Sequence, residues 1–376
     1  MEFRDLKKQY HVLKTDIDEA IADVVSSAHF ISGQQVNELE AMLADYVGVQ
    51  HCITCGNGTD ALTLALMAWD IGKGDAVFVP DFTFFSSGEC PASLGATVVL
   101  VDVKPDSYNM DPEKLEEAII RVKKEGVYNP RAVVTVDLFG LPADYDKIRE
   151  ICNKYGLYLL EDGAQGFGGK LHDKRACSFG DIATTSFFPA KPLGCYGDGG
   201  AVFTDNAEWA DLIRSLAVHG KSKNNKYDNL RLGMNSRLDT VQAAILIKKF
   251  VAFDKYELND VNSVADLYSK YLADTPLKLP VIKEGFYSSW AQYTVQLPES
   301  IDRNSLMSGL KTKGIPTMIY YMKPMHKQIA FSGTYSQKSD CPVTEKLCKT
   351  VLSLPMHPYM SENDIKYVAD EIKNLI

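Results

Sequence analysis

Short apolar runs alternate with amphipathic segments between about residues 50 and 220 of the chain. The apolar runs are rich in β-branched residues, which predicts buried strands. The segments between them carry apolar residues at helical spacing and charges on the opposite face. Alternating strands and helices are typical of βα units around a mostly parallel sheet. The strands are expected at residues 77–79, 97–102, 132–138, 157–161, 182–187 and 201–204.

Two helices of this region have clear ends. Asp111 and Pro112 are a capping residue and a first-turn proline for a helix over residues 112–125, and Gly156 ends a helix over residues 144–155. The pattern therefore predicts an α/β protein, with an N-terminal segment and large domain over residues 1–250 and a smaller α+β domain over residues 251–376. Further helices are expected at residues 5–25, 61–69, 239–250 with a continuation to 272, 304–313 and 362–376, and a strand is expected at 291–297.

Composition removes several classes of protein. The chain has 376 residues and a formal net charge of −9, so it can bury a large core. An acidic chain without a long lysine or arginine block lacks the broad basic surface that nucleic-acid binding requires. The N-terminus shows no apolar signal region, and no apolar run approaches the ~18 residues of a membrane span. We therefore expect a cytoplasmic protein without nucleic-acid or membrane partners.

The eight cysteines are too sparse for a disulfide scaffold. Cys52 and Cys55 have the spacing of a redox or zinc pair, but no second CxxC accompanies them, and His51 is their only close companion. We interpret the pair as small residues on a buried strand end. No metal site is expected.

A lysine in a turn rich in proline and glycine is the first candidate for chemistry. Lys191 follows a strand that ends at Phe187, and prolines and bulky apolar residues flank it in SFFPAKPLG (186–194). Such surroundings desolvate an amine, which lowers its pKa and makes it a nucleophile for a carbonyl group. From this segment alone, a Schiff-base lysine and an ordinary surface loop both stay open.

Two other strand ends carry candidate ligand groups. Asp162 follows the strand at 157–161, and ligands of open α/β sheets bind beyond the carboxyl ends of the strands. Gly56 and Gly58 follow a strand-like segment and open a helix, whose N-terminal amides form a phosphate site by geometry and dipole. Gly56, Gly58 and Ala61 also match a dinucleotide fingerprint, so an NAD-dependent oxidoreductase is kept as a remote alternative.

A lysine, a carboxylate at a strand end and a phosphate cradle together fit pyridoxal 5′-phosphate (PLP). This cofactor needs a lysine for its aldehyde, an acid for its pyridinium nitrogen and donors for its phosphate. The chain also closely resembles the DegT/DnrJ/EryC1/StrS family of PLP-dependent nucleotide-sugar aminotransferases, which have the aspartate-aminotransferase type fold (PLP fold type I). The resemblance rests on FISG (30–33), NGTDAL (57–62), EDGAQ (161–165), the segment around residue 191, GMNSRLD (233–239) and SLPMH (353–357).

The resemblance implies a role for each matching position. Lys191 would be the Schiff-base lysine and Asp162 the partner of the pyridine nitrogen, and both would be catalytic. Gln165 would donate to the ring hydroxyl of the cofactor, and Phe84 would lie against the ring face. Family members are dimers with shared active sites, so a homodimer is expected. The remaining cofactor contacts, to the phosphate, would be Gly58, Thr59, Asp60, Ser186 and, from the neighbouring subunit, Asn235.

Within the family, the amino-acid sequences of residues 186–200 and of LPMHPY (354–359) are most similar to those of the branch that aminates C3 of UDP-linked 3-keto sugars. Glutamate is the expected amino donor, Arg237, Tyr320 and Tyr321 are the expected substrate contacts, and polysaccharide biosynthesis is the expected setting. Members acting on uronic acids carry His-Tyr at the position of Tyr320-Tyr321. Because a tyrosine supplies no positive charge, a neutral 3-keto sugar is favoured here. Amination at C4 of a 4-keto-6-deoxy nucleotide sugar is the alternative.

Overall fold

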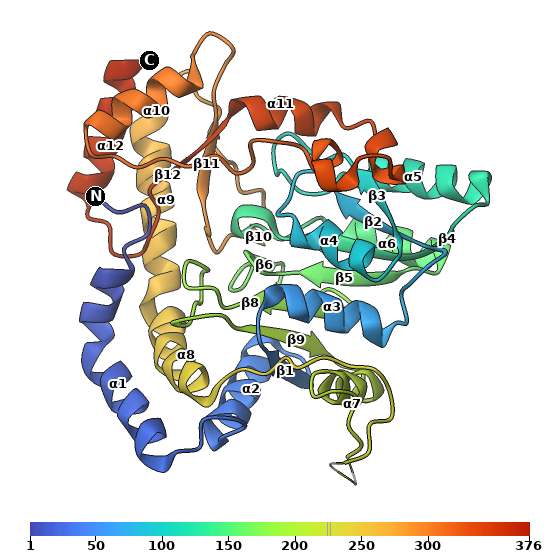
Figure 1. Cartoon of the computed structure of the whole chain (residues 1–376). Helices are drawn as coiled ribbons and strands as arrows, with labels where there is room; N and C mark the ends of the chain where they lie inside the picture. Colours follow the sequence, from blue (N-terminus) through green and yellow to red (C-terminus); the bar gives the residue numbers. More distant parts are fainter. Residues whose placement is uncertain (224, 226) are drawn as a thin grey trace.

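The computed structural model describes every residue of the chain except 224 and 226. Its central sheet has the strand order β1-β9-β8-β5-β4-β2-β3 (Figure 1). Neighbouring strands from β8 to β3 are parallel, and β9 runs antiparallel to both of its neighbours. The predicted mostly parallel sheet is confirmed. The strands are β1 (His51–Cys55), β2 (Asp75–Pro80), β3 (Thr97–Val101), β4 (Asn129–Val136), β5 (Tyr158–Asp162), β8 (Ile182–Ser186) and β9 (Gly200–Thr204).

Helices cover both faces of this sheet because its side chains alternate between two cores. On β2, Val77 and Val79 pack with the helices of one face, while Ala76 and Phe78 pack with those of the other. The expected helices at 112–125 and 144–155 are confirmed as α5 and α6. The first face is covered by α3 (Gly58–Ala68), α4 (Ser86–Ser93) and α7 (Ala207–Leu216), and the second by α5 (Pro112–Glu125) and α6 (Tyr145–Tyr155).

A long helical run links the two ends of the molecule. It consists of α8 (Thr240–Ala252), the π-helical turn η2 (Phe253–Glu257) and α9 (Leu258–Leu272). The N-terminal helix α1 (Leu6–Ser27) packs on α8 through Leu13 and Ile17, and α2 (Gln34–Val47) packs on α8 as well (Figure 1). The expected helix over 239–272 is therefore confirmed with a π turn inside it. The predicted division at residues 250 and 251 falls within this run and stays a prediction.

The C-terminal part packs against α9 and returns to the large sheet. Strands β11 (Tyr293–Gln296) and β12 (Val351–Leu354) pair beside α10 (Arg303–Thr312) and α12 (Glu362–Leu375), as expected for a small α+β unit. The short strand β10 (Phe286–Tyr287) pairs with β6 (Lys170–Leu171), which also pairs with β7 (Lys174–Arg175). The three turns η3 (Met325–Lys327), η4 (Ile329–Phe331) and η5 (Tyr335–Lys338) precede α11 (Pro342–Thr350).

Among the described residues, no helix combines the length and the apolar character that crossing a membrane requires.

Candidate active site

Asp162 is the last residue of β5 and Lys191 lies in the turn after β8, and their charges interact. The backbone N–H of Lys191 donates to the Phe188 carbonyl at 2.8 Å, which closes the turn after β8. Burial lowers the pKa of the Lys191 amine, the charge of Arg4 lowers it further, and the charge of Asp162 opposes both. The expected desolvation of this lysine is confirmed, and its amine is shifted towards the neutral, nucleophilic form.

Asp162 is only 6% exposed and is held by two donors. The Ser87 hydroxyl donates to its Oδ2 at 2.8 Å, and the Ala164 N–H donates to its Oδ1 at 3.2 Å. Burial raises the pKa of Asp162, while Ser87 and the Lys191 ammonium favour its charged form. Ser87 was not among the expected site residues. The sequence could have indicated it, because Ser87 lies seven residues after the end of β2 and three residues after Phe84.

The N-terminus of α3 forms the expected cradle. The Asn57 side chain caps the helix by accepting from the Asp60 N–H at 2.8 Å. Gly58 lies against Ser186 so closely that a Cβ on the glycine would be 2.7 Å from the serine Cβ. The Thr59 hydroxyl is 2.9 Å from the Ser86 hydroxyl. The structure therefore brings Gly58, Thr59 and Ser186 to one place, although they come from two separate segments.

The segment before α8 reaches the same helix end. The Ser236 hydroxyl donates to the Asp60 carboxylate at 2.6 Å and accepts from the Gly56 N–H at 2.9 Å. Asn235, its neighbour, is exposed, and Arg237 is half-buried. Ser236 is a further residue that motif reasoning missed, although GMNSR was singled out. The contacts of Ser236 place this segment beside the cradle within the same chain.

Gln165 and Tyr321 border the site from the other side. The Gln165 Oε1 accepts from the Phe139 N–H at 2.8 Å, and its Nε2 donates to the Tyr321 hydroxyl at 3.1 Å. The ring of Phe84 is 56% exposed and lies 6.5 Å from the ring of Tyr321, and Tyr320 is 5.9 Å from Tyr321 on its other side. Phe84, Tyr320 and Tyr321 thus form one connected group, and Arg237 lies apart from it in the segment before α8.

These residues fit PLP by the chemistry of the donor set. A desolvated amine lies beside a buried carboxylate, and the helix end with its hydroxyl groups provides donors for an anion. The contact between Gly58 and Ser186 leaves no room for a Cβ, so the backbone of α3 approaches β8 closely. Lys191, Asp162, Gly58, Thr59, Ser186 and Gln165 would hold the cofactor, with Phe84 against its ring.

A second cluster of polar residues is a loop anchor. Asp81, His326 and Cys341 each have an atom that could coordinate a metal ion, and these three atoms lie within 4.8 Å of one another. Both oxygens of Asp81 already accept hydrogen bonds from His326, from the Nδ1–H at 2.7 Å and from the backbone N–H at 2.8 Å. Asp81 raises the pKa of His326, which strengthens this pair. The cluster fixes η3 against the end of β2.

Cys52 and Cys55 are free, buried residues of β1, as the interpretation of a buried strand end required. Burial raises the pKa of both thiols, so neither has thiolate character at neutral pH.

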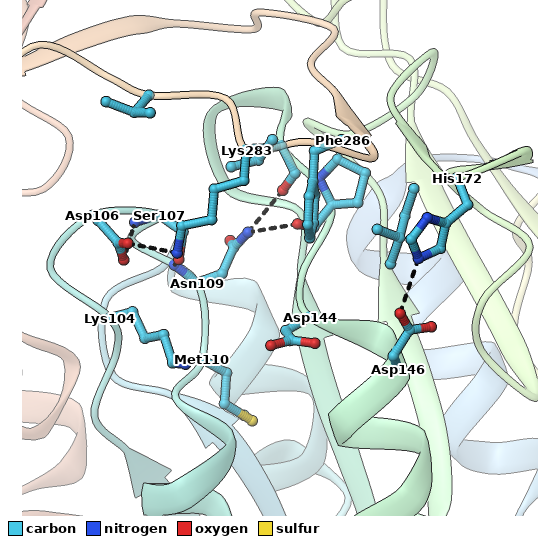
Figure 2. Close-up of a pocket in the computed structure, with 14 residues that line it drawn as sticks. Lys104, Asp106, Ser107, Asn109, Met110, Asp144, Asp146, His172, Lys283 and Phe286 are labelled. Carbon is cyan, nitrogen blue, oxygen red and sulfur yellow. Dashed lines mark hydrogen bonds and ion pairs between the residues drawn. The ribbon is translucent and has the colours of Figure 1, made fainter.

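A pocket of about 130 Å³ lies away from these residues, near the loop after β3 and the start of α6 (Figure 2). Two ion pairs border it, Lys283 with Asp106 at 2.7 Å and His172 with Asp146 at 3.0 Å. The side chain of Asn109 donates to the carbonyls of Leu141 and Pro142. None of the expected site residues lines this pocket.

The fold and this site define a PLP-dependent enzyme of the aspartate-aminotransferase type. More narrowly, the chain belongs to the DegT/DnrJ/EryC1/StrS aminotransferase family, whose profile matches residues 11–373. It is 43% identical to the UDP-2-acetamido-2-deoxy-3-oxo-D-glucuronate aminotransferase of Pseudomonas aeruginosa, with 100% of both chains covered. It is 39% identical to the UDP-N-acetyl-3-dehydro-alpha-D-glucosamine 3-aminotransferase of Acidithiobacillus ferrooxidans, with 99% and 97% covered.

A crystal structure of a family member from Brucella abortus superposes with a TM-score of 0.96 at 46% identity, covering 100% of this chain and 99% of that chain. The family membership confirms the expected fold, the PLP cofactor and the transaminase class. The oxidoreductase alternative gains no support.

Proposed function

We propose that this protein transfers the amino group of an amino acid, glutamate as expected, to the C3 keto group of a UDP-linked sugar. The observation that carries the proposal is the full-length similarity to two enzymes whose names both specify a 3-oxo or 3-dehydro UDP sugar. The intact pair of Lys191 and Asp162 supports transamination. Amination at C4 of a 4-keto-6-deoxy sugar is the less supported alternative.

The chain's own residues account for the steps of this chemistry. Bound PLP supplies an electron sink that stabilises negative charge on the substrate carbon. Lys191, with its lowered pKa, would hold the cofactor by its aldehyde and, when its amine is free, would move the proton at the substrate carbon. Asp162, held by Ser87, would stabilise a positive charge on the ring nitrogen. Gln165 donates to the Tyr321 hydroxyl and so orients it.

The working unit is a homodimer, as the family resemblance implies. Apolar side chains in the segment before α8 support this, because Leu230 is 63% exposed and Leu232 is 92% exposed in the single chain. Large exposed apolar residues gathered in one segment mark interaction surfaces. Asn235 lies three residues from Leu232 and would reach the phosphate of the PLP bound in the neighbouring subunit. We infer a cytoplasmic role in making amino sugars for polysaccharide biosynthesis.

Spectroscopy and turnover together test this function. We expect the protein reconstituted with PLP to show a visible band that borohydride abolishes, and Lys191→Ala to lack the band. The variant should lose activity by about 10²- to 10⁴-fold, because it lacks the proton carrier. Assays with UDP-linked 3-keto and 4-keto sugars then separate C3 from C4. A wild-type protein that shows no band, or that turns over only 4-keto sugars, would contradict the proposal.

A further inference from the structure

Arg4 lies at the catalytic lysine although it is far away in sequence. Its Nη2 donates to the backbone carbonyl of Lys191 at 2.8 Å and to that of Pro192 at 3.4 Å. The preceding residue is fixed as well, because the Phe3 carbonyl accepts from the Met356 N–H at 3.0 Å. The segment before α1 is therefore docked on the active site and does not hang free.

The charge of Arg4 acts on two groups of the site. Burial lowers the pKa of the Lys191 amine and raises that of the Tyr320 hydroxyl, and the charge of Arg4 acts to lower both. The Tyr320 ring lies 6.4 Å from the ring of Phe3, the residue before Arg4. The guanidinium is thus bonded to the backbone of the lysine and interacts electrostatically with the tyrosine expected to contact substrate.

This charge lacks a counter-ion of its own. Within the described part of the chain, no ion pair joins Arg4 to a carboxylate. The carboxylate that acts most strongly on it is Glu257, which already accepts from the Gln9 side chain at 2.8 Å and from the Tyr359 hydroxyl. Arg4 is half-buried, and a guanidinium has five N–H donors, of which one nitrogen serves the two carbonyls. A desolvated charge of this kind is stabilised by an anionic partner.

We propose that Arg4 binds a carboxylate of the substrate at Lys191. The inference rests on the proposed function and names the chemistry of its substrate more closely. Guanidinium and carboxylate match as a planar, two-bond pair, which gives both affinity and orientation. Tyr320 supplies no charge and for that reason favoured a neutral sugar, but Arg4 supplies a positive charge that acts on Tyr320. Two sources remain for the carboxylate: C6 of a UDP-linked 3-keto-uronic acid and the α-carboxylate of the amino donor.

The proposal is tested by measuring the two half-reactions separately for the wild type, Arg4→Gln and Arg4→Lys. The first half-reaction uses glutamate as the amino donor. The second uses a UDP-linked 3-keto-uronic acid, or the same sugar with a hydroxymethyl group at C6, as the acceptor. We expect Arg4→Gln to lower kcat/KM about 10- to 100-fold for the substrate whose carboxylate it binds. The effect on the hydroxymethyl sugar should be small, and Arg4→Lys should recover part of the loss because it keeps the charge.

The arms of the experiment give distinct outcomes. A loss confined to the uronic acid identifies the sugar carboxylate, and a loss confined to the glutamate half identifies the donor carboxylate. An equal loss with all three substrates, or no loss, overturns the proposal and leaves Arg4 as a residue that only positions the Lys191 turn. Lys7→Gln is the matched control, because it removes a positive charge from a side chain that is 84% exposed.

Failure of the proposed function looks different. In that case the wild type itself would aminate none of the UDP-linked 3-keto sugars, while its glutamate half-reaction would still show whether Arg4 binds a carboxylate. The visible band and the thermal midpoint of each variant confirm that it is folded and loaded with cofactor.

Discussion

At the scale of single residues, His357 couples stability to pH. It is 5% exposed, and within the described part of the chain its Nδ1 has no hydrogen-bond partner. Burial lowers its pKa from 6.5 to about 4, with Asp5 opposing the shift and Arg4 and Lys8 adding to it. Between these two values the unfolded chain binds a proton that the folded chain does not. Stability therefore falls as the pH falls through this window, by about 3 kcal/mol at most.

We expect His357→Asn to remove this contribution. The thermal midpoint of the variant should fall less than that of the wild type between about pH 7 and pH 4.5, even if the variant is less stable throughout. His11→Asn changes an exposed histidine and should keep the wild-type slope. Equal slopes for all three proteins would show that the buried ring does not control acid stability.

The proximity of the proposed catalytic residues could be predicted from their neighbours in sequence, but their supports could not. Asp162 ends β5 and Lys191 lies in the turn after β8, and the carboxyl ends of parallel strands meet at one edge of a sheet. The contact of Ser87 with Asp162 spans 75 positions, and that of Arg4 with Lys191 spans 187. Such contacts depend on how α4 and the N-terminal segment dock, which periodicity along the chain does not describe.

At the scale of elements, the strength of the local pattern decided what could be predicted. The strands of the central sheet are buried on both faces and give continuous apolar runs, and α5 and α6 carry caps at their ends. The two-residue strands β6, β7 and β10 are too short to show a periodic pattern, and β10 pairs with β6 because the chain returns there at residue 286. The π turn η2 lies inside a segment whose hydrophobic pattern is helical throughout, so the pattern did not reveal it.

The apolar stripe of α1 packs on α8, and we expect this contact to stabilise the fold. Ile17 is fully buried and packs with Ile245 and Ala252, whereas Val12 on the same helix is 56% exposed. We expect Ile17→Ala to lower the free energy of unfolding by about 2 to 5 kcal/mol, because it leaves a cavity. Val12→Ala should change it by less than about 0.5 kcal/mol.

Chemical denaturation of the PLP-loaded protein measures both variants. Because only the capping residue Asp5 separates Arg4 from α1, a loosened helix should also weaken the hold of Arg4 on the Lys191 turn. If Ile17→Ala were as stable as Val12→Ala, the docking of α1 would contribute little to the fold.

At the scale of the whole molecule, an acidic protein must bind anionic ligands. The net charge is −9, while the cofactor and the proposed substrate both carry phosphate groups. At physiological ionic strength, exposed charges are screened beyond about 8 Å, so the surface field acts weakly on a bound ligand. In the proposed site, local donors would decide binding instead: the N-terminus of α3, Arg237 and Arg4. The acidic surface and the anionic ligands are therefore compatible.

The proposed homodimer with shared sites leads to a prediction for mixed subunits. Asn235→Asp should be inactive, because a carboxylate repels the cofactor phosphate, and Lys191→Ala should be inactive for lack of the amine. If Asn235 serves the partner's site, a dimer of one variant with the other contains one site with both native residues. An equal mixture, unfolded and refolded together, would place half of the molecules in such dimers and regain about a quarter of wild-type activity.

The opposite result has a clear structural meaning. Ser236 bonds to Asp60 of its own chain, so Asn235 also lies near the cradle of its own subunit. If Asn235 serves that site, each mixed dimer has one site without the lysine and one without the asparagine, and the mixture stays inactive. Leu232→Glu, which places a charge on the exposed apolar segment, should shift the protein towards monomers in light scattering. Val127→Glu, at a side chain 68% exposed after α5, should leave the dimer intact. Activity that returns on mixing and disappears with Leu232→Glu would place Asn235 in the partner's site, because only a dimer can join the two native residues.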